Sequence, residues 1–128
     1  FEDKSLTFAE IKKEQKAAYH AGACMISNYL VTLVHASNQL FELAGISNHV
    51  LSPATNTLMA SVLQNLEGKG PKEALTGPIK RGDVQTVRKH LEILAKELPE
   101  LTEVYKVLGK ETMHMIDDFR LKNIFDEK

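Results

Sequence analysis

The sequence has 128 residues, with 16 basic and 17 acidic side chains, and hydrophobic residues make up 43% of it. A chain of this length fits one domain that buries roughly two-thirds of the surface its unfolded form exposes. Because the charges nearly balance, no overall field would steer nucleic acid or an anionic membrane, and we expect neither as a partner.

The cysteine content and the first residues bear on the compartment. The single cysteine excludes an intramolecular disulfide and is compatible with a reducing cytoplasm. The acidic start at Phe1 to Lys4 lacks the basic flank and apolar core of a signal peptide. From these two features we expect a cytoplasmic protein. Because the sequence does not begin with Met, we also expect it to be a piece of a longer one.

In chain order, residues 1–15 are expected to form a charged lead-in or linker, and residues 16–128 one helical domain. Helical character rises from about Lys12, and one long helix is predicted to continue to Ala44, where Gly45 can end it. Gly22 inside this helix costs up to about 1 kcal/mol relative to Ala. Either the helix tolerates it, or another helix or a ligand comes close there.

The stretch from Ala17 to Phe41 contains no Asp, Glu, Lys or Arg. On a helical wheel its apolar side chains take one half, whereas the other half carries neutral polar groups where a surface helix would carry charges: His20, Cys24, Ser27, Asn28, Thr32, His35, Asn38 and Gln39. We expect the stretch to be largely covered, with its polar half against a partner or a pocket. Its unbroken apolar runs are far shorter than the about 20 residues of a membrane span.

Ser52 and Pro53 predict the start of the next helix, which should end near Gly68 or Gly70. Pro71 begins a short helical turn through Leu75. Two glycines and a proline between Thr76 and Asp83 argue against a regular helix there.

Asp83 is a natural N-cap for a fourth helix, and Pro99 breaks or restarts it. The last helix is predicted to extend through Phe119 and to fray into a charged tail beyond Arg120. No segment has the alternation of a strand. The predicted fold is therefore all-α, with about five helices packed around one long central helix.

Three kinds of site can be weighed from the sequence: a metal site, a phosphate-binding loop and an arginine that binds an anion. His20 and Cys24 are one helical turn apart, but no third metal ligand lies within reach in sequence, so a hydrogen-bonded His20 beside a buried, inert thiol is favoured. No glycine loop or Walker sequence for phosphate exists. Arg81, between glycines, could clamp a carboxylate or phosphate in two bonds; the alternative is that Arg81 forms a structural salt bridge while Asp83 only caps the helix.

Two segments carry a family resemblance. The sequence YHAGACMISNYL from Tyr19 to Leu30 resembles the start of the helical C-terminal domain of a family of proposed NADP-dependent oxidoreductases. The sequence LTGPIKRGD from Leu75 to Asp83, followed by Thr86, Val87, His90 and Leu91, is similar to the second hallmark of that domain. The family places a Rossmann-like domain first and is similar to pyrroline-5-carboxylate reductase, ketopantoate reductase and deazaflavin-linked NADP reductases.

The resemblance implies that a preceding Rossmann domain binds NADP, and that this chain alone binds no cofactor and no metal. This domain would be of the dimerisation-domain type found in Rossmann reductases. It would form a homodimer and close one wall of the cleft for a small-molecule substrate. His20 and Asn28 are then candidate catalytic residues, and Ser27, Thr76 and Arg81 candidate substrate-binding residues. The fragment is not expected to be active alone. The alternative is a helical module that binds a partner protein and catalyses nothing.

Overall fold

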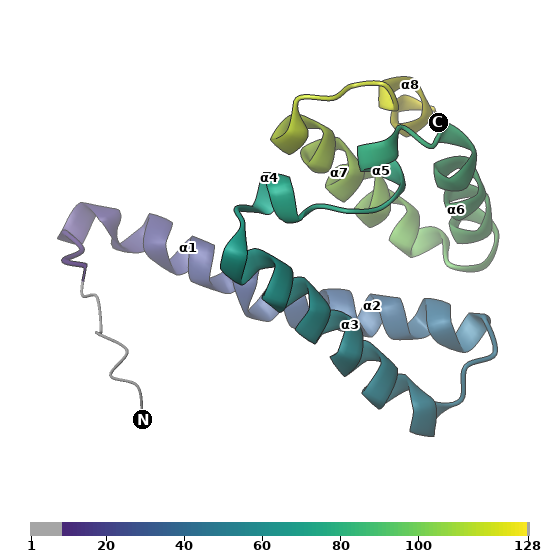
Figure 1. Cartoon of the computed structure of the whole chain (residues 1–128), viewed down its shortest axis with the longest axis horizontal. Helices are drawn as coiled ribbons and strands as arrows, with labels where there is room; N and C mark the ends of the chain where they lie inside the picture. Colours follow the sequence, from purple (N-terminus) through teal and green to yellow (C-terminus); the bar gives the residue numbers. More distant parts are fainter. Residues whose placement is uncertain (1–8, 128) are drawn as a thin grey trace. The chain divides into compact units, whose positions relative to one another are not determined.

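The computed structural model describes residues 9–127, and every regular element in this range is a helix (Figure 1). The all-α prediction is therefore confirmed. Among the same residues, no helix combines the length and the hydropathy that crossing a membrane requires. Residue contacts divide the chain into two compact units, Phe1–Thr55 and Asn56–Lys128.

The first unit contains a 3-10 turn, η1 (Lys13–Gln15), followed by α1 (Lys16–Ile26) and α2 (Asn28–Leu43). The prediction of one unbroken helix from Lys12 is wrong at Ser27, which separates α1 from α2. The Ser27 hydroxyl donates to the Ala23 carbonyl at 2.6 Å, a bond that competes with the backbone ladder and bends helices. Residues 1–8 of the expected lead-in lie outside the described residues.

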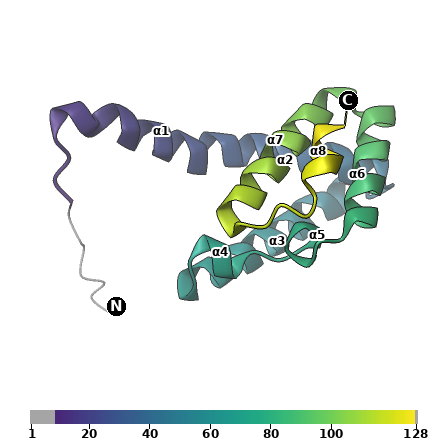
Figure 2. The ribbon, with the colours of Figure 1, turned by 90° about the horizontal axis from the view of Figure 1, so that it is seen from above.

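The irregularity at Ser27 is local. The Val31 amide still donates to the Ser27 carbonyl at 3.2 Å, so the helical ladder continues beyond the break. Figures 1 and 2 show α2 continuing in nearly the same direction as α1. The two helices therefore present a single, nearly continuous surface.

The end of α2 is predicted correctly from Gly45. This glycine has φ of 84°, and the amides of Gly45 and Ile46 donate to the carbonyls of Glu42 and Phe41. These two bonds satisfy carbonyls that the last helical turn leaves unpaired, which is the Schellman arrangement.

The next helix, α3 (Asn48–Gly68), begins earlier than predicted, because Pro53 lies inside it. The Ser47 carbonyl accepts from the amides of Val50 and Leu51, so the helix is already established before the proline. Because proline has no N–H group, Pro53, the sixth residue of α3, removes one helical hydrogen bond just after the first turn. The predicted end at Gly68 is confirmed. At the α3 start, Leu51 and Thr55 are buried, and the Thr55 hydroxyl donates to Asn38 of α2 at 3.1 Å.

The second unit contains α4 (Pro71–Ala74), α5 (Pro78–Arg81), α6 (Val84–Glu97), α7 (Pro99–Ile116) and α8 (Lys122–Asp126). The predicted starts at Pro71 and Pro99 and the cap at Asp83 are confirmed. The prediction against helix between Thr76 and Asp83 is wrong for one turn, α5. Gly77 and Gly82, with φ of 95° and 66°, confine that turn on both sides.

The end of α7 differs from the prediction. The helix stops at Ile116, because Asp117 adopts φ of 53° and takes the role that glycine plays after α2. The amides of Asp117 and Asp118 donate to the carbonyls of His114 and Met113. Asp tolerates this left-handed conformation better than most residues. Phe119 therefore lies in the connection after α7.

The segment beyond Arg120 does not fray: α8 packs against α6 and α7 and contributes to the core of the second unit (Figure 2). Leu121 and Phe125 are each only 1% exposed. The buried cluster consists of Val87, Met113, Leu121, Ile124 and Phe125, with Ile79, Leu91 and Tyr105 packed against it. Burial of one such side chain contributes about 1.5–3 kcal/mol, so the segment from Leu121 to Phe125 stabilises the second unit.

Candidate functional site

The five residues singled out by the sequence fall in both units. His20 lies on α1, Ser27 at the break, and Asn28 at the start of α2. In the second unit, Thr76 precedes α5 and Arg81 is its last residue. Their functional roles stay predictions.

Ser27 and Asn28 form a small polar cluster at the break. The Ser27 hydroxyl lies 2.8 Å from the Asn28 side-chain oxygen and 2.6 Å from the Ala23 carbonyl. Both residues are exposed. With its oxygen facing Ser27, the Asn28 side chain presents its amide NH2 group, a donor that suits a carbonyl or carboxylate oxygen. His20 lies two helical turns before Ser27 and is exposed as well.

Cys24 is only partly covered, so the expectation of a buried thiol is wrong. Within residues 9–127, no three His, Cys, Asp or Glu side chains come together in a way that could hold a metal ion.

The loop between Thr76 and Asp83 ends in a well-formed helix cap. The Asp83 carboxylate accepts from the Thr86 hydroxyl at 2.7 Å and from the Thr86 amide at 3.1 Å. These bonds, the side-chain one first, lower the pKa of Asp83 below its ordinary value. Arg81 is exposed, and none of the ion pairs between described side chains involves it. The structural salt bridge that was the alternative role for Arg81 is therefore not found there.

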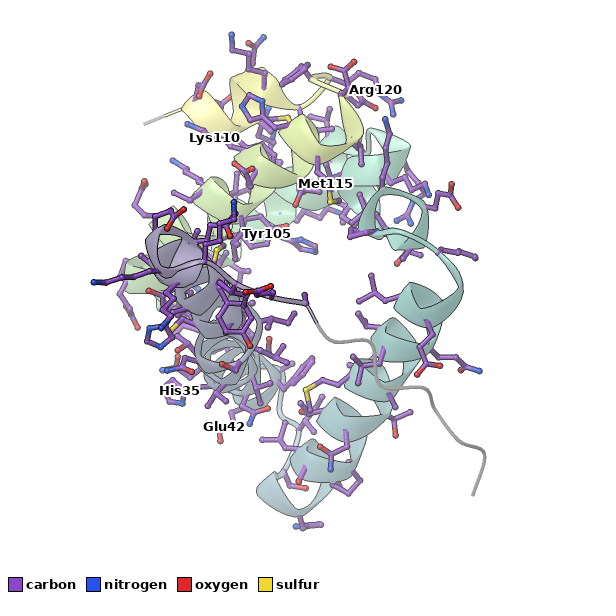
Figure 3. All side chains as sticks on the ribbon, turned by 90° about the vertical axis from the view of Figure 1, so that its left-hand side faces the viewer. His35, Glu42, Tyr105, Lys110, Met115 and Arg120 are labelled. Carbon is purple, nitrogen blue, oxygen red and sulfur yellow. The ribbon has the colours of Figure 1, made fainter. Side chains whose placement is uncertain are left out.

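A different arginine, Arg120, holds the loop. Its guanidinium binds the Asp118 carboxylate, with the shortest bond at 2.6 Å, and donates to the Lys80 carbonyl at 3.2 Å. It also lies against Gly82, where a Cβ would stand 2.5 Å from Arg120 Nη1. Arg120 projects from the connection after α7 (Figure 3). Its hydrogen bond to Asp118 raises the pKa of Arg120 and lowers that of Asp118.

A pocket of about 310 Å³ lies beside this loop. Its apolar wall comes from the segment before α5, from α5 and from α7: Leu75, Pro78, Ile79, Leu108 and Gly109. The lining residues with polar side chains are Thr76, His90, Tyr105 and Thr112. Thr76 is thus the one of the five predicted site residues that lines this pocket.

His90 and Tyr105 form a hydrogen-bonded pair in the pocket. His90 Nδ1 lies 2.7 Å from the Tyr105 hydroxyl, and the two rings meet edge to face with centroids 5.8 Å apart. The Tyr105 ring also packs against Phe125 in the core. Burial raises the pKa of the Tyr105 hydroxyl. Tyr105 projects from α7 (Figure 3).

The sequence offers one signal for this pair. His90 falls in the segment that follows the second hallmark, but Tyr105 stands out in the sequence only as an apolar position of the last helix. The two residues are fifteen positions apart, and the sharp reversal at Leu98 and Pro99 brings α6 and α7 side by side.

The uncharged stretch is not covered as expected. Neither α1 nor α2 contains a buried residue. Tyr19, Ile26 and Tyr29 are 63%, 71% and 60% exposed. Together with Leu30 and Leu33, which are also exposed, these residues recur at helical spacing and form what we call the α1–α2 apolar face.

These features define an all-helical domain with an exposed uncharged face in one unit and a small, mostly apolar pocket in the other. The chain belongs to a family described as a domain of unknown function (DUF2520), which it matches over residues 1–112. The match includes both segments that carry the resemblance. No curated protein and no solved structure matches the chain.

Proposed function

We propose that this chain is the C-terminal dimerisation and substrate-cleft domain of an NADP-dependent oxidoreductase, whose Rossmann domain is not part of the sequence. The α1–α2 apolar face is the observation that carries the proposal. A face of Tyr19, Ile26 and Tyr29 exposed to water loses the favourable free energy that burial would give. Protein interfaces are depleted of charge at their centre and enriched in aromatic residues, as this face is.

A second copy of the chain is the proposed occupant of the α1–α2 apolar face. Most homo-oligomers are two-fold symmetric dimers, in which the same patch on both subunits must complement itself. An uncharged face meets this requirement without placing like charges opposite each other. Gly22 falls on the same side of the helix, and nothing lies within 4 Å of the place that a Cβ on it would take, which would let a partner helix come close.

The polar side of the same helices is the proposed substrate side. His20 and Asn28 would orient or protonate a substrate oxygen there, and Ser27 would bind the substrate beside them. Thr76 and Arg81 are proposed as substrate-binding residues of the second unit. The cluster at the break supports this assignment, because Ser27 fixes the Asn28 amide through a 2.8 Å bond. The NADP would be bound by the Rossmann domain, and the protein would work in the cytoplasm.

The test uses the full-length protein with NADPH. We expect NADPH to bind the full-length protein and not this chain alone, as measured by calorimetry. His20→Ala and Arg81→Ala should lower turnover while thermal unfolding and NADPH binding stay as in the unsubstituted protein. Lys69→Ala, a change on a charged residue between α3 and α4, serves as the control. Failure of the full-length protein to bind NADPH would overturn the proposal.

The second candidate function is a helical interaction module, and the same α1–α2 apolar face favours it. In this case the face receives an unrelated protein and no reaction takes place. The sequence that precedes Phe1 in the full-length protein separates the two candidates. A strand followed by a Gly-x-Gly-x-x-Gly turn supports the oxidoreductase, and an unrelated domain supports the module.

A further inference from the structure

We propose that the pocket lined by α5, α6 and α7 binds a neutral, mostly apolar small molecule through one carbonyl or hydroxyl oxygen, which hydrogen-bonds to Tyr105. Three observations carry the inference: the charge of the lining, the His90–Tyr105 pair, and the packing that fixes Tyr105.

The lining determines the charge and size of the ligand. No Asp, Glu, Lys or Arg is among the described residues that line the pocket. A charged ligand would find no oppositely charged partner there, whereas a neutral ligand would cover the apolar wall. The volume of about 310 Å³ is at the lower end of the range for ligand pockets. The ligand is therefore small and neutral.

The His90–Tyr105 pair determines which polar group the ligand carries. A neutral imidazole has one protonated and one bare ring nitrogen, and either can be Nδ1. If Nδ1 is bare, Tyr105 donates to it and the phenol oxygen can accept from an alcohol. If Nδ1 is protonated, it donates to the phenol oxygen at the same 2.7 Å, and the Tyr105 O–H can donate to a carbonyl. One pair thus suits both an alcohol and the corresponding carbonyl compound.

Packing holds the Tyr105 hydroxyl in place. The Tyr105 ring lies between His90 and the buried Phe125 ring, with centroid distances of 5.8 and 6.4 Å. The neighbouring Thr112 O–H already donates to the Leu108 carbonyl at 2.8 Å, so Thr112 offers a ligand only an acceptor oxygen. A ligand oxygen entering the pocket would therefore find Tyr105 as a positioned partner.

The binding proposal does not need the NADP domain. The experiment below uses this chain without NADPH, so that its failure leaves the dimer and the cofactor tests unaffected.

The test compares three probes of similar shape: cyclohexanone, cyclohexanol and the hydrocarbon methylenecyclohexane. Each is titrated into the ¹⁵N-labelled chain, and amide shifts are followed by NMR. We expect shifts at Thr76, Ile79, Gly109 and Thr112, with weak affinities that reflect the few atoms of each probe.

The variant Tyr105→Phe keeps the ring and removes the hydroxyl. It should weaken binding of both oxygen compounds by about three- to tenfold, the effect of one hydrogen bond, and leave the hydrocarbon within about twofold. Tyr29→Phe makes the same change on α2 and should alter none of the three affinities. Thr112→Leu should fill the pocket and weaken all three.

Two results would overturn the proposal. One is an equal effect of Tyr105→Phe on all three probes, because the hydroxyl would then not contact the ligand oxygen. The other is the absence of shifts at the pocket amides in the unsubstituted chain. If Tyr105→Phe lowers the unfolding temperature strongly, Thr112→Leu alone decides whether the pocket is the site.

Discussion

Gly109 on α7 lies directly against the ring of Phe125 on α8, so that a Cβ on the glycine would stand only 2.5 Å from Phe125 Cε1. A residue without a side chain is therefore required at this position if α8 is to pack on α7. Gly109 is itself buried, and Phe125 is the largest fully buried side chain of the second unit.

Gly109→Ala should destabilise the second unit. The added methyl group overpacks the core at a cost of about 1–3 kcal/mol, against a helix-propensity gain of up to about 1 kcal/mol. Chemical denaturation followed by circular dichroism measures the difference. Gly68→Ala is the matched control, because nothing lies within 4 Å of its Cβ position. Unchanged or higher stability in Gly109→Ala would show that α8 does not pack as described.

Arg120→Ala should loosen the turn α5. The substitution removes the donor to the Lys80 carbonyl and the group that covers Gly82. Hydrogen exchange should then accelerate at the amides of Gly82 and Asp83, which bond to the carbonyls of Ile79 and Pro78. Arg88→Ala, which removes another exposed ion pair, should leave these amides unchanged. Equal exchange in both variants would contradict the role of Arg120.

Acid should destabilise the second unit through Asp126. Its hydrogen bond to Lys110, at 2.8 Å, is the main cause of a pKa below the ordinary value of 3.8. The folded state therefore binds fewer protons than the unfolded state, so this stabilisation is present above about pH 4 and is lost as pH falls through the folded pKa. The free energy of unfolding, measured with urea from pH 6 downward, should fall less steeply in Asp126→Asn than in the unsubstituted chain. Lys110→Met should make this pH dependence less steep to the same extent. The double variant Asp126→Asn/Lys110→Met should behave nearly like either single variant.

Alkali should act through Tyr105, whose pKa is raised by burial. In the unfolded chain a phenol ionises near pH 10. The folded state keeps the neutral form to higher pH, so stability falls as pH rises above about 10. An ultraviolet titration of the tyrosines should show one phenol that ionises at higher pH than the others. This high-pH component should disappear in Tyr105→Phe and persist in Tyr29→Phe. If the high-pH component remained in Tyr105→Phe, its assignment to Tyr105 would be wrong.

Local signals in the sequence predict much of the fold. Gly45, Pro71, Asp83 and Pro99 set helix boundaries through short-range backbone chemistry, and each acts where it is expected. The errors arise where a residue takes an unusual role. Ser27 turns its hydroxyl back on the helix, and Asp117 ends α7 in a conformation usually taken by glycine.

Long-range contacts could not be predicted in the same way. Leu121 and Phe125 stand in a segment rich in charge, and only their contacts with α6 and α7 show that they are core residues. The residues of the candidate site also differ in whether a local signal or a long-range contact reveals them. Thr76 is found from its loop, whereas Tyr105 gains its place in the pocket from its pairing with His90 across the neighbouring helices α6 and α7.

The most direct test of the central claim is the mass of this chain in solution, measured by light scattering at tens of micromolar. We expect a dimer, and we expect Ile26→Glu on the α1–α2 apolar face to raise its dissociation constant at least about tenfold, because like charges would then face each other. His35→Glu is the matched control. It adds the same charge on a side of α2 that already carries one, because His35 projects from the same side as Glu42 (Figure 3). A strictly monomeric chain, or equal dissociation by both variants, would contradict the proposal.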